Sequence, residues 1–376
     1  MFSKYKKDNI MYWYTKLYGP EDNTHYSLEE LFAESAQYNI MLSERSNGKS
    51  YAMKKFILLN AYHFKNEFVY VRRLDTDIKT ASIIGWFADM PIAEYTDGEY
   101  EGVDYWQGDI YFYSLDSEGK KVKGQCIGHT MPVSTYGKYK SRAYPKVTDI
   151  VFEEFITDST YLFDEVTIFM QLVSTIARDR DVRVWMLGNK ISQYCPYVLD
   201  WGLTNALSQK QGTIDVYTFT REVDNDIIKT KIAVENCSAL AHKSKMFFGK
   251  TAENINGGKW EGETKEVPKL PMEYEKYTMI YECVMSDCGF DFLVQLLIND
   301  DGGQIAYVKP FKYKREILRH ITTQFSDNPW YTQRFRDDIP AEVMLRQLIS
   351  NSKVCFSHNL CGNNFDQMLK NRKGMI

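Results

Sequence analysis

The sequence has no long apolar run and no strong excess of one charge. No stretch approaches the roughly 20 apolar residues that a membrane-spanning helix needs, and the opening residues Met-Phe-Ser-Lys-Tyr-Lys-Lys-Asp lead into no apolar signal core. With 46 Lys and Arg against 50 Asp and Glu, the formal charge of −4 does not fit a polybasic nucleic-acid binder. We therefore expect a soluble protein with no membrane partner.

Paired cysteines are also missing. The seven cysteines are an odd, widely scattered set without a Cys-x-x-Cys pair, which favours free thiols in a reducing cytosol. Cys355, His358 and Cys361 lie close in sequence, but a structural zinc site takes four ligands and no fourth stands nearby. We expect these three residues to be packed or surface residues.

The composition that is present is that of a folded protein of about two domains. The 376 residues are 44% apolar, 26% charged and 15% aromatic, which excludes a disordered or fibrous chain. The charge is uneven, because the chain from Lys309 onward carries 12 basic and 6 acidic residues. The C-terminal part is therefore basic and the remainder is acidic.

Strand and helix patterns alternate along residues 1–205. This alternation predicts an α/β domain with a mainly parallel sheet and helices on both faces, interrupted by glycine-rich hairpins at 97–135. The expected strands are 39–42, 68–72, 149–153 and 182–187, and the expected helices are 51–62 and 161–179.

The rest of the chain has a different pattern. Residues 206–271 are predicted to form a lid or linker, because their last part is rich in Gly, Pro and charge. Residues 272–376 are predicted to form a smaller α+β domain. Its expected elements are antiparallel strands at 277–284, 290–298 and 304–308, with helices from Pro340 onward.

The strongest chemical signal is Ser46-Asn-Gly-Lys-Ser50, which lies between an expected strand and an expected helix. In such a loop, backbone N–H groups and the helix N-terminus surround phosphates, while Lys49 neutralises charge and the Ser50 hydroxyl binds Mg²⁺. Ser43 stands where the full P-loop pattern has its first Gly. The predicted nucleotide-binding residues are Arg45, Ser46, Asn47, Gly48, Lys49, Ser50 and Tyr51.

An acidic pair, Glu153 and Glu154, follows the expected strand 149–153. The carboxyl end of a strand is where a parallel α/β sheet places its ligands. One carboxylate can hold Mg²⁺ through water, and the other can orient and deprotonate an attacking water. Together with the loop about a hundred residues upstream, the pair indicates ATP hydrolysis with ATP and Mg²⁺ bound.

Two further polar residues fit the same chemistry. Asn189 follows the strand 182–187, where it could contact the γ-phosphate or the attacking water, or could be a simple turn residue. Arg178 ends the helix after the acidic pair. It could be a surface charge that complements the helix dipole, or an arginine finger that reaches a neighbouring subunit in a ring.

As a set, these residues resemble a known family. Arg45, two places into the loop, is typical of the viral DNA-packaging ATPases of the large-terminase group, and the sequence is most similar to the compact packaging ATPases of small tailed bacteriophages that work with a packaging RNA. Ser43 departs from the usual Gly or Ala, and Glu153 stands where an Asp is more usual. The matching stretches are 48–54, 68–73, 143–156, 177–180 and 187–190.

The resemblance implies an ASCE-type P-loop NTPase domain and a homomeric ring, for which five subunits are expected. Such a ring docks on the portal, or connector, of a preformed procapsid in the host cytoplasm and hydrolyses ATP to move double-stranded viral DNA inward. Lys49 and Ser50 would hold phosphate and Mg²⁺, and Glu153 would support the Mg²⁺ position. Glu154 would be the catalytic base, Asn189 would lie in the coupling motif, and Arg178 would be the trans-acting finger.

The resemblance also implies that the C-terminal domain has a vestigial, inactive RNase H-like nuclease fold. Most of its acidic candidates lie in expected turns; they are Glu282, Asp287, Asp291, Asp300 and Asp301. The basic and aromatic run from Lys309 to Arg319 would suit a packaging RNA or the portal, unless it is only a solvated face. The predicted nucleic-acid contacts are Lys312, Lys314 and Arg315, with Arg73 and Lys79 gripping DNA in the ring.

Two other functions are compatible with the sequence. One is a large terminase that retains nuclease activity as well as ATPase activity. The other is a ring component that binds nucleotide without turnover and docks on RNA or the portal.

Overall fold

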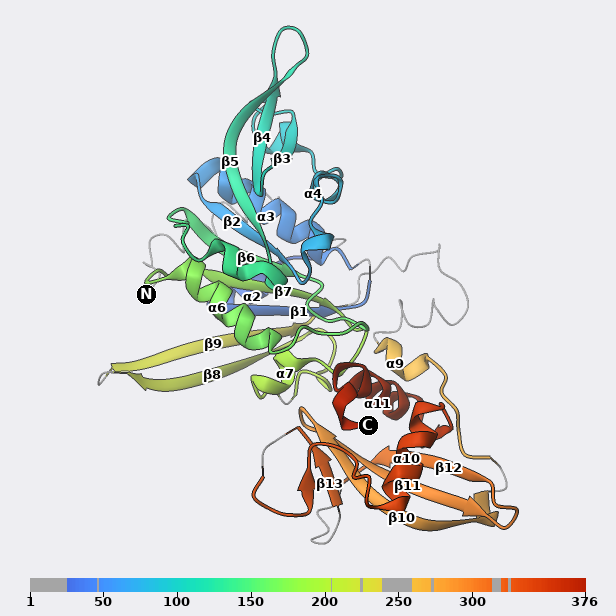
Figure 1. The fold of residues 1–376 in the computed structure, drawn as a ribbon. Coiled ribbons are helices and arrows are strands. Elements are labelled where there is room, and N and C mark those ends of the chain that lie inside the picture. Colours follow the sequence, from blue (N-terminus) through green and yellow to red (C-terminus); the bar gives the residue numbers. More distant parts are fainter. Residues whose placement is uncertain are drawn as a thin grey trace. The chain divides into compact units, whose positions relative to one another are not determined.

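The computed structural model divides into two compact units, each with its own sheet (Figure 1). The structure describes residues 26–45, 47–203, 205–223, 226–238, 259–271, 274–312, 319–323 and 326–376. The first unit comprises Met1–Phe155, Leu162–Asn189 and Asn205–Gly258, and the second comprises Ile156–Tyr161, Lys190–Thr204 and Lys259–Ile376. Within the described residues, no helix combines the length and the apolar character needed to cross a membrane.

A nine-stranded sheet forms the centre of the first unit. Its central strands are parallel neighbours in the order β5-β2-β6-β7-β1-β9. The outer pairs β3–β4, β4–β5 and β9–β8 are antiparallel. In sheet order the strands are β3 (Gly102–Trp106), β4 (Asp109–Leu115), β5 (Lys121–Pro132), β2 (Glu67–Arg72), β6 (Val147–Glu153), β7 (Arg183–Asn189), β1 (Tyr38–Ser43), β9 (Asp226–Asn236) and β8 (Thr213–Val223).

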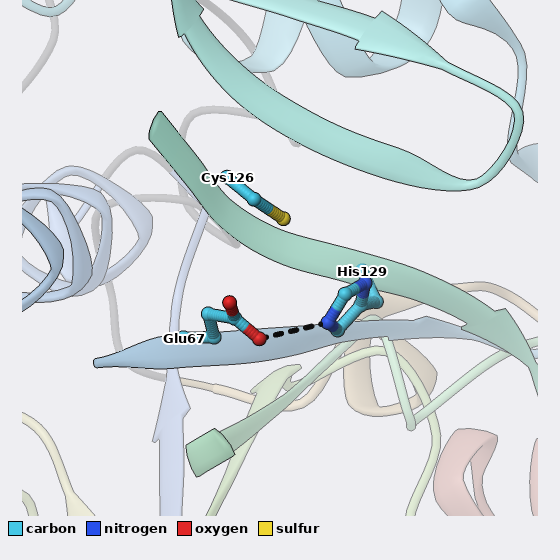
Figure 2. Close-up of side chains that lie close together, drawn as sticks. All are labelled: Glu67, Cys126 and His129. Atoms are coloured by element: carbon cyan, nitrogen blue, oxygen red, sulfur yellow. Dashed lines mark hydrogen bonds and ion pairs between the residues drawn. The ribbon is translucent and has the colours of Figure 1, made fainter. Parts of the chain in front are cut away.

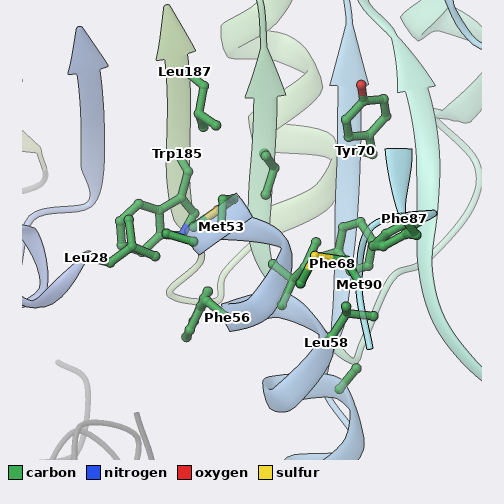
Figure 3. Close-up of a cluster of buried hydrophobic side chains, with 14 of the residues drawn as sticks. Leu28, Met53, Phe56, Leu58, Phe68, Tyr70, Phe87, Met90, Trp185 and Leu187 are labelled. Carbon is green, nitrogen blue, oxygen red and sulfur yellow. The ribbon is translucent and has the colours of Figure 1, made fainter. Parts of the chain in front are cut away.

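Helices cover both faces of the central strands, as apolar runs buried on both sides require. Phe152 of β6 packs on Phe169 of α6 with ring centroids 5.0 Å apart. On the other face, Trp185 of β7 packs edge-on against Phe32 of α2 at 5.0 Å, in a cluster that also includes α3 (Figure 3). The helices of this unit are α2 (Glu29–Glu34), α3 (Lys49–Phe64), α4 (Thr80–Trp86), α5 (Ile92–Tyr95) and α6 (Glu165–Ala177), with 3₁₀ turns η1 (Asp75–Asp77) and η2 (Val133–Tyr139).

The parallel α/β fold predicted for the first part of the chain is confirmed. The expected strands correspond to β1, β2, β6 and β7, and the expected helices correspond to α3 and α6. The glycine-rich insertion does form hairpins, β3–β4 and β4–β5, but β5 then continues as a parallel neighbour of β2. The insertion therefore extends the sheet.

The boundary that the sequence placed at 205/206 differs from the units of the structure. Strands β8 and β9, which lie in the expected lid or linker, pair with each other, and β9 adds to β1 in parallel. Conversely, residues 190–204 belong to the second unit. Of the predicted linker segment 251–271, residues 251–258 lie outside the described residues, and the remainder contains α9 (Glu261–Thr264).

The second unit is built on a six-stranded mixed sheet. The expected antiparallel meander is confirmed by β10–β11 and β11–β12, while β13 runs parallel to β10 and β15 parallel to β12. In sheet order the strands are β14 (Tyr331–Thr332), β13 (Arg319–Thr322), β10 (Tyr277–Asp287), β11 (Phe290–Asn299), β12 (Gln304–Pro310) and β15 (Val354–Phe356). The other elements are α7 (Pro196–Asp200), α10 (Pro340–Ser350), α11 (Asn359–Asn371), η3 (Tyr274–Lys276) and η4 (Lys373–Met375).

Candidate nucleotide-binding site

The predicted P-loop lysine lies at the carboxyl end of the central strands. Gly48 has a φ of 86° at the point where α3 begins, a left-handed conformation that favours glycine. Lys49 is buried, and its Nζ donates to Ser43 Oγ at 3.1 Å and to Asn189 Oδ1 at 2.5 Å. Because Ser43 ends β1 and Asn189 ends β7 in parallel register, the two strands bring their terminal oxygens to the same ammonium group.

The charge of Lys49 is placed to meet an anion. Burial lowers the pKa of Lys49, and nearby acidic groups including Glu153 and Glu154 act in the opposite direction. Both hydrogen-bond acceptors of its ammonium are uncharged oxygens. Lys49 also opens the 16-residue helix α3, whose N-terminus favours negative charge.

The other predicted loop residues have different environments. Asn47 Nδ2 donates to Ser238 O at 2.8 Å, whereas its buried Oδ1 has no hydrogen-bond partner among the described residues. The Tyr51 hydroxyl lies 3.3 Å from the Tyr95 hydroxyl. Ser50 is the second residue of α3, and Arg45 is exposed. Ser46 lies outside the described residues.

The two glutamates at the end of β6 differ in their surroundings. Both carboxylate oxygens of Glu153 are held, because the Tyr70 hydroxyl donates to Oε2 at 2.8 Å and Trp86 Nε1 donates to Oε1 at 3.2 Å. The Glu154 side chain is 55% exposed and pairs with Arg72 Nη2 at 2.5 Å. Its backbone has a φ of 56°, a conformation that costs energy in a non-glycine residue and often occurs at functional sites.

Arg178 lies away from these residues. It follows the last residue of α6, with a φ of 50°, and its Nη2 donates to Arg142 O at 3.3 Å. Helix α6 runs back from the carboxyl end of β6 to the amino end of β7. Arg178 therefore lies at the amino ends of the parallel strands, whereas Lys49 lies at their carboxyl ends. The structure therefore brings Lys49, Asn189 and the glutamates to one edge and leaves Arg178 at the other.

The prediction that Arg73 contacts DNA is wrong for this structure. Arg73 is buried, and its Nε donates to Glu165 Oε1 and Oε2 at 3.1 and 2.8 Å, while Nη2 donates to Phe155 O at 2.6 Å. A buried guanidinium with these partners is not available to phosphate. Lys79, by contrast, is exposed at the start of α4 and stays a predicted contact.

The basic run of the second unit is interrupted by a buried arginine. Arg319, which the sequence grouped with the phosphate contacts, is buried and pairs with Glu342 at 2.9 Å. That grouping is therefore wrong for Arg319. Lys312 is exposed, whereas Lys314 and Arg315 lie outside the described residues.

The acidic candidates of the second unit do not gather into a metal site. Within the described residues, no three of them meet. Asp287, at the end of β10, is fully buried, and its carboxylate accepts from the hydroxyls of Tyr194 and Thr323 and pairs with Arg372 at 3.1 Å. The hydrogen-bonding capacity of this carboxylate is thus already used by the protein.

Several neighbours of the site were missed in the sequence. Arg72 and Tyr70 lie on β2, which pairs with β6 so that Val71 faces Phe152. The sequence singled out Arg73 of the stretch 68–73 as a functional residue. The pairing of β2 with β6 instead brings Arg72 to Glu154. The parallel βαβ order could have indicated this contact. In a parallel sheet, the polar residue that ends one strand lies beside the polar residues that end the neighbouring strand.

The parallel sheet, the glycine before α3 and the buried lysine beside strand-end polar groups define a P-loop NTPase of the α/β class. Residues 21–234 match the family described as podovirus DNA encapsidation protein (Gp16). Because the match spans more than half of the chain, this protein belongs to that family. The resemblance recognised in the sequence is confirmed.

Individual relatives are similar to part of the chain. The DNA packaging protein of Bacillus phage phi29 is 29% identical over 196 residues, which cover 50% of this chain and 54% of the relative. The DNA packaging protein of Bacillus phage B103 is 30% identical over 178 residues, covering 46% and 50%. The chain thus spans about half the length of the curated relatives it matches.

A solved structure supports the fold across both units. The chain is similar to a subunit of the bacteriophage phi29 viral genome packaging motor assembly, with a TM-score of 0.51 and 20% identity over 92% of this chain and 99% of that one. At this identity the likeness concerns the fold.

Proposed function

We propose that this chain is the ATP-hydrolysing subunit of a ring motor that drives double-stranded viral DNA into a preformed capsid. The observation that carries the proposal is that Lys49 contacts Ser43 and Asn189 at the carboxyl ends of the parallel strands, where β6 ends at Glu153 and Glu154 follows. Family membership supplies the biological setting, because the phi29 and B103 relatives are DNA packaging proteins.

The loop and α3 fit the phosphates of ATP. The buried Lys49 ammonium, held by neutral oxygens, can exchange them for a phosphate oxygen without breaking an ion pair. Ser50 and Glu153 offer the oxygen ligands that Mg²⁺ prefers. A bound Mg²⁺ would neutralise phosphate charge there, while the Tyr70 and Trp86 hydrogen bonds fix the orientation of Glu153.

Glu154 is the candidate base. It is the more exposed of the two glutamates, and its partner Arg72 is a half-buried arginine near the surface. When that contact opens, the carboxylate can accept a proton from a water molecule beside the γ-phosphate. Asn189, now bonded to Lys49, would sense whether phosphate has taken its place.

Arg178 would serve a neighbouring subunit, since it stands at the edge opposite to Lys49 of its own chain. This requires a homo-oligomeric ring, for which we propose five subunits. The portal and DNA are the proposed partners, with Lys79 facing DNA, and the ring would act in the host cytoplasm while attached to the procapsid. Lys312, Lys314 and Arg315 would contact packaging RNA or the portal.

The second unit would be a vestigial nuclease. The saturated environment of Asp287 supports this assignment, because a metal ion would have to displace Arg372 and two hydroxyl donors. In domain terms, we propose that the ATPase comprises the first unit, including β8 and β9, and that the second unit serves docking.

DNA-stimulated phosphate release from the full chain on procapsids tests the motor function. Glu154→Gln and Lys49→Ala are each expected to lower the rate by at least about 100-fold, whereas the exposed Glu118→Gln serves as the matched control. Mixed rings of Lys49→Ala and Arg178→Ala subunits should regain activity, because one subunit supplies the lysine and the next the arginine. Hydrolysis that survives Glu154→Gln would overturn the motor proposal, and mixtures as inactive as their components would overturn the trans role of Arg178.

A further inference from the structure

A cluster of Glu67, Cys126 and His129 lies in the first unit at the amino end of β2, away from the P-loop edge. The three side chains point toward one another from two neighbouring strands, β2 and β5 (Figure 2). One ligand atom from each lies within 4.8 Å of the other two. Among the residues that the structure describes, it is the one group of three His, Cys, Asp or Glu side chains that meets this closely.

A bulge in β5 creates the cluster. Residues three apart on a regular strand, such as Cys126 and His129, point to opposite faces. Here β4 pairs Ile110 with Gly128 but Tyr111 with Cys126, so Ile127 is an extra residue in the ladder. Such a bulge re-aims the neighbouring side chains and brings Cys126 to the side of His129.

The ring of His129 has a carboxylate at each nitrogen. Its Nδ1 lies 2.6 Å from Asp109 Oδ1, and its Nε2 lies 3.0 Å from Glu67 Oε2. A neutral imidazole carries a single N–H and can donate to only one of them. Both contacts are favourable when a proton or a metal ion lies between Nε2 and Glu67 Oε2.

The surrounding charges assign roles to the two carboxylates. Arg142 Nη2 lies 3.0 Å from Asp109 Oδ1, whereas Glu67 Oε1 lies 4.0 Å from Nζ of the exposed Lys146. Asp109 is therefore held as an acceptor for the Nδ1 proton. This leaves Nε2 to face Glu67 and the Cys126 thiol, the arrangement by which a carboxylate orients a metal-binding histidine.

We propose that Glu67, Cys126 and His129 bind a divalent transition-metal ion of the zinc class. Thiolate and imidazole are ligands that zinc prefers, whereas Mg²⁺ and Ca²⁺ take oxygen ligands. Zinc bonds of about 2.0–2.3 Å place neighbouring ligand atoms roughly 3.5 Å apart in a tetrahedron. The Nε2 to Oε2 distance of 3.0 Å is already close to this value, and the Cys126 sulfur lies within 4.8 Å of a ligand atom of each of the other two residues.

Binding would displace the proton of the Cys126 thiol, and any proton on Nε2, into solvent. The metal ion binds the thiolate form of a cysteine, so it must compete with the proton of the thiol. A water molecule would complete the four-coordinate shell. The bound ion would tie β2 to β5 at the point where β5 leaves its antiparallel partner β4.

Metal titration of the chelator-treated full chain tests the site, with Zn²⁺ followed by calorimetry and Co²⁺ by absorption. We expect one equivalent of Zn²⁺ to bind, to release protons and to raise the melting temperature. Bound Co²⁺ should show a thiolate-to-cobalt charge-transfer band. Parent protein that binds no Zn²⁺, or Co²⁺ that binds without this band, would overturn the proposal.

Three variants separate this site from the other thiols. Cys126→Ser should abolish the cobalt band, and Asp109→Asn, which changes the group behind His129, should weaken Zn²⁺ binding by about 10- to 100-fold. Cys355→Ser removes a half-buried thiol of the second unit and should leave binding unchanged. Circular dichroism confirms folding. Folded Cys126→Ser that binds as tightly as the parent would show that the metal lies elsewhere.

Discussion

The two units each place a carboxylate beside an arginine at the end of a strand, but with opposite results. At the end of β6, Glu154 is largely exposed and meets Arg72 near the surface. At the end of β10, Asp287 is fully buried, and Arg372, Tyr194 and Thr323 occupy its oxygens. The Glu154–Arg72 contact can therefore open and exchange partners, whereas the contacts of Asp287 are fixed inside the second unit.

This difference shows that an acidic residue at a strand end is not by itself a catalytic signal. Several acids of the molecule are buried and held by arginine, and removing one partner of such a pair leaves an uncompensated charge. The other buried pairs are Asp149 with Arg183, Glu165 with Arg73 and Glu342 with Arg319. Glu154 differs from them mainly in its exposure.

Neighbouring arginines of the first unit provide the sharpest test of this contrast. Arg73→Ala leaves Glu165 buried without its cation and should destabilise the first unit by about 3–5 kcal/mol. Arg72→Ala breaks the pair with the exposed Glu154 and a longer contact of 3.8 Å with Glu153, and should cost only about 1 kcal/mol. Both losses can be measured as changes in the free energy of unfolding in urea, with hydrogen exchange of peptides from β6 as the readout for the first unit. If both substitutions lowered the free energy of unfolding equally, burial would not distinguish the two ion pairs.

The second unit offers the matching test. Arg372 is less buried than Arg73, so Arg372→Ala should cost about 2–3 kcal/mol in that unit. Adding Asp287→Asn removes the orphaned charge and should recover part of the loss, as read by exchange of β10 peptides in a double-mutant cycle. If Arg372→Ala left the β10 peptides as protected as before, Asp287 would not depend on its cation, and the comparison would fail.

Local patterns predicted much of the nucleotide site. The strand, glycine-lysine loop and helix at 39–62 are adjacent in sequence, and their local geometry required no knowledge of distant contacts. Asn189 was also expected, because a parallel sheet gathers strand ends at one edge. Its hydrogen bond to Lys49 follows from the pairing of β1 with β7.

The features that sequence reasoning missed depend on pairing between distant segments. Arg73 and Glu165 are 92 residues apart, and nothing local shows that this arginine, rather than Arg72, is buried. Strands β8 and β9 join the sheet only because β9 adds to β1. The bulge that brings Cys126 to His129 depends on the register with β4, which alternation along one strand does not give.

A third kind of buried carboxylate extends the comparison. Glu235 on β9 is buried beside the central strand β1, and the acceptor role of its Oε2 is filled by the Tyr26 hydroxyl. Burial raises the pKa of Glu235 from 4.5 to about 7. Unlike Asp287, this group is neutralised by a proton, and its contribution to stability is present below pH 4.5 and is lost as the pH rises through about 7.

Glu235→Gln should therefore stabilise the first unit in a pH-dependent way. The amide oxygen can still accept from Tyr26 but never ionises, so the gain relative to the parent should be about 2 kcal/mol larger at pH 8 than at pH 5. Urea unfolding at both pH values measures it, with the exposed Glu222→Gln as the control. A gain that does not change with pH would mean that Glu235 ionises in the native protein as readily as in the unfolded chain, and burial alone would then not explain its surroundings.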